Sequence, residues 1–435
     1  MKKILLIGNG AREHVIAETL KRSPQGCELY VYMSAMNPGV LDNCHTFRIG
    51  KLDDMEAIKK FAVECKPDFA FIGPDNPIAD GAADALLEVG IKTVAPLKIC
   101  AQLESSKAFT RELVAKYGIE GSPKFRVFTT SNGLREFIKE LGEYVVKADG
   151  LTGGKGVKVS GEHLANIDEG FAYAMECLNA DGRVVIEEKF IGVEFSLMSF
   201  VDGVHVVDMP AVQDHKRALE GDKGMNTGGM GTYSDANHSL PFLRPGDLEA
   251  AHAITVKVAE AIYKETGKYF KGIMYGGFMA VKNGVGLIEY NARFGDPEAM
   301  NVLPLLKTDF IDVCERIIAG NLESVEFENK ATVLKYIVPE GYPENPRKGE
   351  KIEIGEVPAG VKMYYGSVDA RPDGVYLSGS RALAFVGIAD SLESAESLAQ
   401  SAVGSVNGPV FYRRDIGTAE LIQKRVEVIR SLYVL

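Results

Sequence analysis

The sequence predicts a multidomain protein that combines α/β and α+β architecture, and three observations support this. Residues 1 to about 103 alternate short apolar strands with helices, which is typical of a small parallel sheet covered on both faces. A glycine-rich strand–turn–strand segment follows at residues 144–160. Beyond about residue 328, short strands separated by proline and glycine turns, with one helix near 392–406, predict a small α+β domain.

Length and composition are those of a large globular protein. At 435 residues, the chain is long enough for about three domains with their own cores. The net charge of -11 argues against general nucleic-acid binding, and no apolar run approaches the roughly 18 residues of a membrane span. Anionic ligands must therefore be bound by local lysine, arginine and backbone groups.

The cysteines and the amino terminus bear on the compartment. The apolar run at the start ends after four residues, at Gly8, so we expect a first strand and no signal peptide. No Cys-x-x-Cys pair and no histidine at metal-ligand spacing is present. We expect reduced, mostly buried thiols in a cytoplasmic protein: Cys27, Cys44, Cys65, Cys100, Cys177 and Cys314.

The first 103 residues predict a ligand site at one edge of the parallel sheet, because ligands of such folds bind beyond the carboxyl ends of the strands. We expect strands at 3–7, 28–33, 68–72 and 92–95, with helices through Val15 to Leu20, near 55–65 and near 79–89. The strand ends are polar turns: Gly8-Asn9-Gly10, Asn37-Pro38-Gly39 and Gly73-Pro74-Asp75.

The first of these turns is similar to a dinucleotide-binding loop but lacks its pattern. Glu13 stands at the third glycine position, and the second strand supplies no acidic residue for a ribose hydroxyl. A hydride-transfer enzyme is therefore disfavoured. The turn can still hold a single phosphate at a helix N-terminus, assisted by Arg12, and a plain strand–helix turn is the alternative.

Two helices are expected before the glycine-rich segment. The first begins near Lys107, a position where a cation opposes the helix dipole, so the side chain either reaches a nucleotide phosphate or is simply solvated. Its expected caps are Ser105 or Ser106 at the start and Gly118 at the end. The second helix is expected over residues 129–142, with Thr130 or Ser131 as its cap.

Residues 144–160 predict a β-hairpin that covers a polyphosphate. Glycines in its loop can adopt φ > 0 and let N–H groups close on anionic oxygens, while Lys147 and Lys155 add mobile charges. A Walker A loop is excluded because Lys155 is followed by a glycine and an alternating strand pattern. An ordinary glycine-rich hairpin is the alternative. The loop glycines are Gly150, Gly153, Gly154 and Gly156.

Residues 184–194 predict the place of a purine nucleoside. A purine needs strand backbone along its edge, an apolar cover and a carboxylate for the ribose hydroxyls, and this segment offers all three. We expect Glu187 near the exocyclic amine, Glu188 beside it, Phe190 along the ring edge and Glu194 on the ribose.

Residues 210–233 are dense in charge and glycine without being repetitive, and such a loop is costly to order without a ligand. We interpret the stretch as a binding loop for an anionic substrate, with a mobile surface loop as the alternative. Its candidate residues are Asp214, Lys216, Asn226, Thr227, Gly228 and Gly229.

Residues 286–298 carry the sharpest chemical pattern. On a strand, Glu289 and Asn291 share one face, and two oxygen ligands suit Mg²⁺ that keeps waters and phosphate oxygens as its other ligands. Arg293 continues this face toward the charge that develops on a transferring phosphoryl group. Asp296, just past a turn, is expected to be free to hold an ammonium. The alternative is a strand with a solvated polar face.

Together these motifs resemble the phosphoribosylamine–glycine ligases (glycinamide ribonucleotide synthetases), a family of ATP-grasp enzymes of purine biosynthesis. Many ATP-grasp enzymes share the hairpin and the Glu-x-Asn pair. Three runs are specific to this family: those that begin at Asp214 (Asp-His-Lys-Arg), Asn226 (Asn-Thr-Gly-Gly-Met-Gly) and Arg293 (Arg-Phe-Gly-Asp-Pro-Glu). The resemblance runs from end to end, with departures at Ala11, Asp75, Thr152 and Gly153.

The resemblance implies an N-terminal parallel α/β (preATP-grasp) domain at 1–103, an ATP-grasp domain at 104–328 with a lid at about 121–190, and a C-terminal α+β domain at 329–435. It implies the ATP-dependent ligation of glycine to 5-phosphoribosylamine through a glycyl phosphate, giving glycinamide ribonucleotide, ADP and phosphate. ATP and Mg²⁺ or Mn²⁺ are the implied cofactors. We expect a cytoplasmic monomer with small-molecule substrates and no nucleic-acid or membrane partner.

The resemblance also implies a role for each candidate site residue. Metal ligands are Glu289 and Asn291. Nucleotide contacts are Lys107, Lys147, Gly153, Gly154, Lys155, Gly156, Glu187, Glu188, Phe190 and Glu194. Substrate contacts are Gly8, Asn9, Gly10, Arg12, Asn37, Pro38, Gly39, Asp75, Asn226, Thr227, Gly228 and Gly229. Catalytic candidates are Arg293, Asp214, Asp296 and Lys216. The alternatives are an ATP-grasp ligase for another carboxylate and a non-catalytic nucleotide-binding protein.

Overall fold

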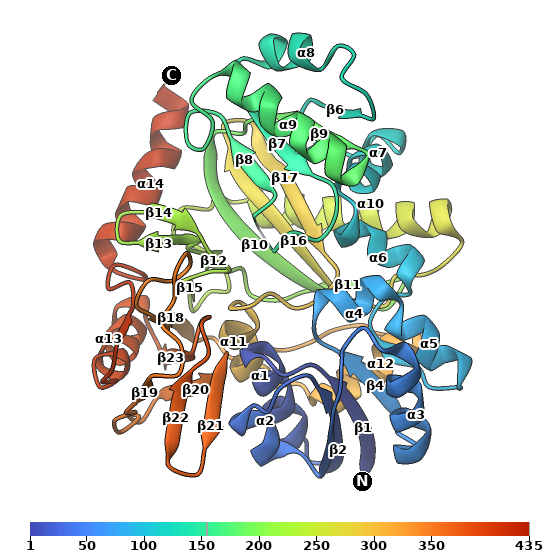
Figure 1. Cartoon of the computed structure of the whole chain (residues 1–435), viewed down its shortest axis with the longest axis vertical. Helices are drawn as coiled ribbons and strands as arrows, with labels where there is room; N and C mark the ends of the chain where they lie inside the picture. The colour runs from blue at the N-terminus through green and yellow to red at the C-terminus, as the bar shows by residue number, and fades with distance from the viewer. Residues whose placement is uncertain (154, 435) are drawn as a thin grey trace.

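The structure is a computed structural model that describes residues 1–153 and 155–434. Its main sheets are an N-terminal, a central, a lid and a C-terminal sheet (Figure 1). In the figure the N-terminal part, in blue, lies below the central sheet, and the C-terminal part, in orange, lies beside the N-terminal part. The lid, with α8 and α9, lies above the central sheet.

The N-terminal sheet has five parallel strands in the order β3-β2-β1-β4-β5, which confirms the predicted parallel α/β architecture. Its elements are β1 (Lys2–Ile7), α1 (Ala11–Lys21), β2 (Cys27–Met33), α2 (Pro38–Asn43), β3 (Thr46–Ile49), α3 (Met55–Cys65), β4 (Phe69–Ile72), α4 (Asp75–Asp80), α5 (Ala82–Glu88) and β5 (Thr93–Val94).

Three N-terminal elements differ from the sequence expectation, and the first is α2, which begins at Pro38 where only a turn was expected. The sequence gives no signal for β3, because this short edge strand is largely exposed and lacks an alternating apolar face. The single helix expected near 79–89 is two helices, α4 and α5. Gly81 between them adopts a φ of 98°, a left-handed conformation that ends α4.

Helices α6 (Lys98–Ser105) and α7 (Lys107–Lys116) connect the N-terminal part to the lid. Ser106 caps α7 by accepting a hydrogen bond from the N–H of Phe109 at 3.0 Å, which confirms one of the two expected caps. The lid sheet has the order β6-β9-β7-β8. Its elements are β6 (Phe125–Phe128), α8 (Leu134–Leu141), β7 (Tyr144–Ala148), β8 (Val157–Val159), α9 (Ile167–Asp181) and β9 (Val184–Glu188).

The predicted glycine-rich hairpin is present, because β7 and β8 pair antiparallel. The start of α8 is a correction. This helix begins at Leu134 rather than near residue 129, and its N-cap is Gly133 with a φ of 75°. The N–H of Leu134 donates to the carbonyl of Ser131, so the preceding residues form a turn and neither Thr130 nor Ser131 caps the helix.

The central sheet is antiparallel, in the order β11-β10-β16-β17, and α10 packs on it. Its elements are β10 (Gly192–Val201), β11 (Val206–Asp208), α10 (Asp247–Thr266), β16 (Gly272–Val281) and β17 (Gly284–Asn291), followed by α11 (Ala299–Val302), the 3₁₀ helix η1 (Leu303–Leu305) and α12 (Phe310–Ala319).

The stretch at 210–233 is not a free loop, which corrects the sequence interpretation. It forms β12 (Gln213–Asp214), β13 (Arg217–Leu219), β14 (Lys223–Asn226) and β15 (Gly231–Ser234). Strands β13 and β14 make a hairpin, and β15 pairs with β18 of the C-terminal sheet. This pairing crosses the expected domain boundary near residue 328, so the proposed boundaries stay a prediction.

The C-terminal part is of mixed α and β structure, as predicted. Its sheet has the order β12-β15-β18-β23-β20, with β24 on β18, and a ribbon has the order β19-β22-β21. Its elements are β18 (Ala331–Pro339), β19 (Lys351–Ile352), β20 (Val361–Tyr365), β21 (Val368–Arg371), β22 (Gly374–Leu377), β23 (Leu383–Ala389), α13 (Leu392–Val403), β24 (Val410–Phe411) and α14 (Ala419–Val434).

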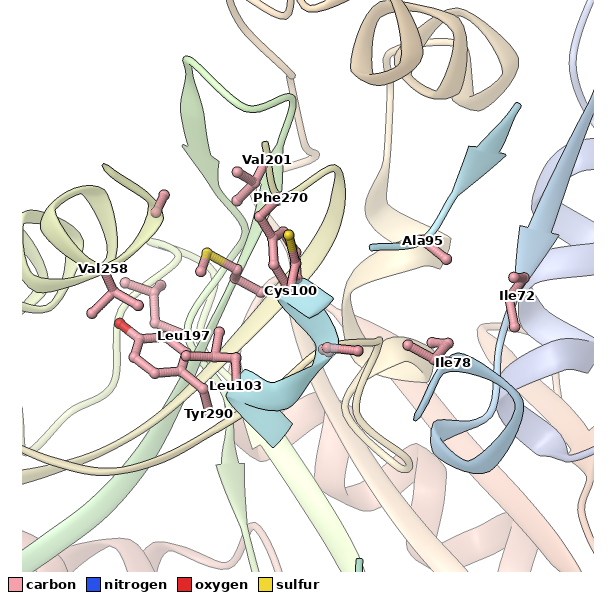
Figure 2. Packing of buried hydrophobic residues seen from close by; sticks show 14 of the residues in the cluster. Ile72, Ile78, Ala95, Cys100, Leu103, Leu197, Val201, Val258, Phe270 and Tyr290 are labelled. Carbon is pink, nitrogen blue, oxygen red and sulfur yellow. The ribbon is translucent and has the colours of Figure 1, made fainter. Parts of the chain in front are cut away.

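One apolar core joins the N-terminal and central parts. Cys100 and Leu103 of α6 lie between Ile78 of α4 and Leu197 of β10 (Figure 2). All four side chains are buried, and burying a side chain of leucine size contributes about 1.5–3 kcal/mol. The shared core therefore holds the two parts in one arrangement.

Two further expectations concern thiols and membranes. In residues 1–153 and 155–434 all six cysteines are free thiols and five of them are buried, as predicted. Among the helices that the structure describes, none is long and apolar enough to cross a membrane.

Candidate functional site

A cavity of about 1010 Å³ lies where the lid, the central sheet, the β13–β14 hairpin and the start of the N-terminal part meet. It brings together residues predicted from segments far apart in the sequence. Those that line it are Arg12, Asp75, Lys107, Lys147, Gly153, Glu187, Glu188, Phe190, Glu194, Asp214, Lys216, Asn226, Thr227, Gly228, Glu289, Asn291, Arg293 and Asp296.

The other predicted residues do not line this cavity. They are Gly8, Asn9, Gly10, Asn37, Pro38, Gly39, Lys155, Gly156 and Gly229. Gly154 lies outside the described residues. A substrate contact by the two turns at residues 8–10 and 37–39 therefore requires a binding site that extends past Arg12, beside the cavity.

The expected metal ligands lie at the end of β17. Glu289 and Asn291 both line the cavity, and β17 supplies them from alternate positions as predicted. Burial opposes ionisation of Glu289, but Lys216, Lys147 and other nearby cations outweigh it and lower its pKa. An ionised carboxylate beside an amide oxygen fits a hard divalent cation. Among the described residues no cluster of three or more histidine, cysteine or acidic side chains is arranged for a metal.

Lys147 lies on β7 and is 3% exposed, and its position is fixed by two contacts. It forms an ion pair with Glu187, and its Nζ donates to the carbonyl of Ile288 at 3.0 Å. Glu187 also accepts two hydrogen bonds from the guanidinium of Arg111, at 2.7 and 3.1 Å. Sequence reasoning missed Arg111, although it stands one helical turn after Lys107 on α7. The carboxylate expected near the purine amine is therefore held between two cations.

Lys107, at the start of α7, points toward the lid loop. Its Nζ donates to the carbonyl of Gly150 at 2.8 Å. Asp149, in the same loop, accepts from Ser106 Oγ at 3.2 Å and from the N–H of Ala108 at 3.0 Å. The lid hairpin is thus tied to the N-terminus of α7, which explains why a lysine occurs where the helix dipole disfavours it.

Lys216 lies near the carboxylate predicted to bind ribose. Its Nζ is 3.6 Å from Oε2 of Glu194. The charge of Glu194 raises the pKa of Lys216 despite burial, so the side chain stays a cation. It stands close enough to Glu289 for that carboxylate also to raise its pKa. Lys216 therefore lies near both Glu194, which is expected to bind the ribose, and Glu289, which is expected to bind the metal at the phosphates.

Arg293 is held by Glu104, a residue that the sequence analysis missed. Its Nη2 lies 3.0 Å from Oε1 of Glu104, whose Oε2 accepts from the N–H of Ala292 at 2.7 Å. Burial opposes ionisation of Asp75, but the charges of Arg293 and Arg12 outweigh it and lower the pKa of Asp75. These side chains form a charged group where the N-terminal part meets β17.

The turn before α1 differs from the expected phosphate loop. Oε2 of Glu13 accepts from the N–H of Gly10 at 2.6 Å, and its Oε1 accepts from Nε of Arg12 at 2.6 Å. Nη1 of Arg12 donates to the carbonyl of Phe294 at 3.2 Å. The carboxylate of Glu13 thus accepts from the N–H of Gly10 and from Nε of Arg12, two donors that were expected to bind a phosphate. For these two donors the predicted phosphate site at the helix N-terminus is wrong.

The Asn37 turn is built against the C-terminal part. Asn37 caps α2 through its Oδ1, and its Nδ2 donates to the carbonyls of Asn9 at 3.0 Å and Tyr365 at 2.7 Å. A Cβ on Gly39 would overlap the ring of His14, which explains the glycine there. The two predicted turns are thus joined to each other and to β20.

Asp296 is not free to hold an ammonium, which is a further correction. Its Oδ1 accepts from the hydroxyl of Tyr336 at 2.6 Å and lies 3.2 Å from Nη2 of Arg381. Arg381 also donates to the carbonyls of Gly228 and Gly229, at 2.6 and 3.1 Å. Sequence reasoning missed Arg381, since it lies 85 residues from Asp296 in a strand-rich segment.

A different pair of carboxyl groups lines the cavity without an ion-pair partner among the described residues. Asp214 and Glu298 both line it, and within the described residues neither forms an ion pair with a lysine, arginine or histidine. Glu298 is 2% exposed, and its Oε1 accepts from the hydroxyl of Tyr275 at 2.8 Å. Burial, followed by the charge of Glu298, raises the pKa of Asp214, and burial raises that of Glu298. The pair is therefore suited to accept an external cation.

Comparisons with known proteins were made for the whole chain. Residues 2–104 match the N domain of phosphoribosylglycinamide synthetase, residues 105–299 its ATP-grasp (A) domain and residues 332–419 its C domain. A phosphoribosylamine–glycine ligase from Methanosarcina barkeri is 48% identical over 99% of both chains. The chain belongs to the phosphoribosylglycinamide synthetase family. A relative of the same name from Pyrococcus furiosus is also 48% identical, over 99% of this chain and 98% of its own.

Solved structures agree with this family assignment. Phosphoribosylamine–glycine ligase from Thermotoga maritima superposes with a TM-score of 0.80 at 29% identity, covering 95% of this chain and 99% of its own. A biotin carboxylase from Campylobacter jejuni has a TM-score of 0.72 at 16% identity, covering 99% of this chain and 95% of its own. At that identity the likeness concerns the fold alone, and it is consistent with the N-terminal, ATP-grasp and C-terminal arrangement of this synthetase family.

Proposed function

We propose that this protein joins glycine to 5-phosphoribosylamine, with ATP converted to ADP and phosphate, and so forms glycinamide ribonucleotide for purine biosynthesis. The observation that carries the proposal is the cavity itself. It combines the oxygen-ligand pair Glu289 and Asn291, a row of buried cations and the N-terminal residues Arg12 and Asp75. Membership in a family whose relatives carry the name phosphoribosylamine–glycine ligase supplies the substrates.

Activation of glycine is the first chemical step. A carboxylate is a poor acylating agent, so one of its oxygens attacks the γ-phosphorus of ATP and gives glycyl phosphate and ADP. Lys107 and Lys147 offset the charge of the phosphates, and Arg293 offsets the charge that develops on the transferred group. Glu289 and Asn291 would hold Mg²⁺ or Mn²⁺, which supplies charge neutralisation for the phosphoryl oxygens when bound.

Capture of the acyl group is the second step. The amine of phosphoribosylamine attacks the acyl carbon and expels phosphate, and no covalent bond to the protein is needed. Arg12 and Asp75, which line the cavity from the N-terminal part, are the groups that we assign to the sugar. The lid loop, which includes Gly150 and Gly153, excludes water from the acyl phosphate.

The ammonium of glycine needs an anionic partner, and we assign it to Asp214 and Glu298. Both carboxylates line the cavity and have no ion-pair partner in residues 1–153 and 155–434. An ammonium beside them offsets the burial and the charge of Glu298 that together raise the pKa of Asp214. Asp296 then serves to hold the Gly228–Gly229 turn through Arg381.

We further propose that the protein is a cytoplasmic monomer that acts on small molecules. Free, mostly buried thiols support a reducing compartment, and the acidic net charge supports the absence of a nucleic-acid partner. We also propose three domains, at residues 1–103, 104–328 and 329–435, with a lid at about 121–190.

ADP release by the purified protein tests the proposed function. The assay contains ATP and Mg²⁺, with and without glycine, and generates phosphoribosylamine in place from ribose 5-phosphate and ammonia. We expect ADP only when both co-substrates are present. ADP formed with a different carboxylate indicates another ATP-grasp ligase, and ATP binding without ADP indicates a non-catalytic protein. Either result contradicts the proposal.

Replacing Arg293 with alanine tests its role in phosphoryl transfer. We expect kcat to fall by about 10²- to 10³-fold, as when a preorganised donor to a developing charge is lost, while the Kd for ATP changes only a few-fold. Stopped-flow kinetics and calorimetry separate the two effects. Arg316→Ala is the control, because Arg316 forms only a surface ion pair with Asp312. Near-normal turnover of Arg293→Ala removes Arg293 from the mechanism.

Replacing Glu298 with glutamine tests the ammonium site. The amide keeps an acceptor for Tyr275 but loses the charge, so we expect the KM for glycine to rise by about 10- to 100-fold with the KM for ATP unchanged. Glycolate, which has a hydroxyl in place of the ammonium, should bind the variant and the wild type equally as a competitor. Glu326→Gln, on the surface, is the control. Equal weakening of glycine and glycolate contradicts the assignment.

A further inference from the structure

The β13–β14 hairpin has an unusual tip. Asp222 adopts a φ of 56°, a left-handed conformation that a residue with a side chain seldom holds without support. Gly221 and Gly224 on either side of it also have positive φ, at 70° and 80°. The tip therefore needs contacts from outside the hairpin to keep this conformation.

Two arginines from the end of the chain provide those contacts. Oδ1 of Asp222 lies 2.9 Å from Nη1 of Arg413, and Oδ2 of Asp222 is paired with Arg425 of α14. Arg413 is 1% exposed, and its Nη2 is also 2.7 Å from Oδ2 of Asp415. The charge of Arg413 is therefore compensated inside the protein by Asp222 and Asp415.

Further hydrogen bonds fix the hairpin to the same segment. The N–H of Gly221 donates to Oδ2 of Asp415 at 2.9 Å, and Nη1 of Arg413 donates to the carbonyl of Arg217 at 3.1 Å. The N–H of Arg414 donates to Oε1 of Glu220 at 3.2 Å. The tip and one strand of the hairpin are thus bound to residues 413–415.

The base of the hairpin lies in the cavity. Lys216 and Asn226, at its two ends, line the cavity together with Thr227. The N–H of Thr227 donates to the carbonyl of Lys216 at 2.7 Å, which closes the base. Arg217 lies 2.7 Å from Oε2 of Glu162 in the lid. A displacement of the hairpin therefore moves the side chains of Lys216 and Asn226 in the cavity and also disturbs the ion pair between Arg217 and Glu162 of the lid.

Helix α14 itself reaches the cavity, because Arg425 and Val428 line it. This helix begins at the residue where the match to the family's C domain ends, residue 419. In Figure 1 it runs upward beside β13 and β14 toward the lid. His215 is buried near the two arginines and adds no positive charge beside them. Burial, followed by the charges of Arg413 and Arg425, lowers the pKa of His215 to about 3.

We propose that Arg425 of α14, together with Arg413, is a positioning residue that holds the β13–β14 hairpin in its catalytically competent place through Asp222. The inference rests on the proposed function, because the base of the hairpin carries the catalytic candidate Lys216 beside Asn226 and Thr227, which are expected to contact the substrate. Both arginines are paired with Asp222. Both act on the reaction through the position of the hairpin.

Replacing Arg425 with methionine tests this assignment. Methionine keeps an apolar stem but releases Asp222, so we expect kcat/KM for ligation to fall by about 10- to 100-fold, the size of effect that a displaced binding group produces. Arg430→Met is the matched control, because Arg430 is an exposed arginine on the same helix. We expect it to keep wild-type activity. Wild-type activity of Arg425→Met would overturn the proposal.

A double variant separates positioning from unrelated damage. Asp222→Asn and Arg425→Met act on one ion pair, so their combination should lose no more activity than the more severe single variant. Additive losses would overturn the assignment. Hydrogen–deuterium exchange supplies a readout that does not depend on the reaction. In Arg425→Met we expect faster exchange at residues 217–226 and unchanged exchange in the central sheet, and unchanged exchange at 217–226 would also overturn it.

Exchange data also distinguish failure of this proposal from failure of the proposed function. If the protein does not ligate glycine at all, the exchange experiment still reports whether Arg425 orders the hairpin. If ligation occurs but exchange and kcat/KM do not change in Arg425→Met, only the positioning role is wrong.

Discussion

The site depends on one constraint: a charge taken out of water must be compensated by another charge or by hydrogen bonds. Most of the buried cations at the nucleotide end of the cavity are held by a carboxylate from another element. Glu187 of β9 holds Lys147 and Arg111, and Glu104 of α6 holds Arg293. The carboxylates fix the positions of the cations before any phosphate arrives, so binding ATP does not require them to be ordered.

The same constraint works in the opposite sense at a second group of cavity residues, Asp214 and Glu298. Asp214 and Glu298 form no ion pair within the described residues, and burial raises the pKa of both although nearby cations such as Lys216 oppose this. A ligand that brings an ammonium completes the charge balance, whereas a neutral ligand leaves it incomplete. The proposed selection of an amino acid thus follows from two carboxyl groups that the protein leaves without an ion-pair partner among the described residues.

Local patterns predicted the parts of this arrangement that local physics determines. Strand alternation placed Glu289 and Asn291 on one face, the glycine spacing predicted the lid hairpin, and the serine before Lys107 predicted the cap of α7. The partners of these groups could not be predicted in the same way. Glu104 and Arg293, for example, are 189 positions apart, and only the fold brings them together. The prediction for Asp296 was wrong for this reason, since Arg381 reaches it from the distant connection between β22 and β23.

The central claim is that the cavity activates the glycine carboxylate as an acyl phosphate, and oxygen transfer tests this most directly. Glycine labelled with ¹⁸O in its carboxylate is incubated with ATP, Mg²⁺ and phosphoribosylamine, and the released phosphate is analysed by mass spectrometry. Attack of the carboxylate on ATP followed by loss of phosphate leaves one glycine oxygen in each phosphate, so we expect one ¹⁸O per phosphate released. Phosphate without ¹⁸O, formed at the rate of ligation, would contradict the account.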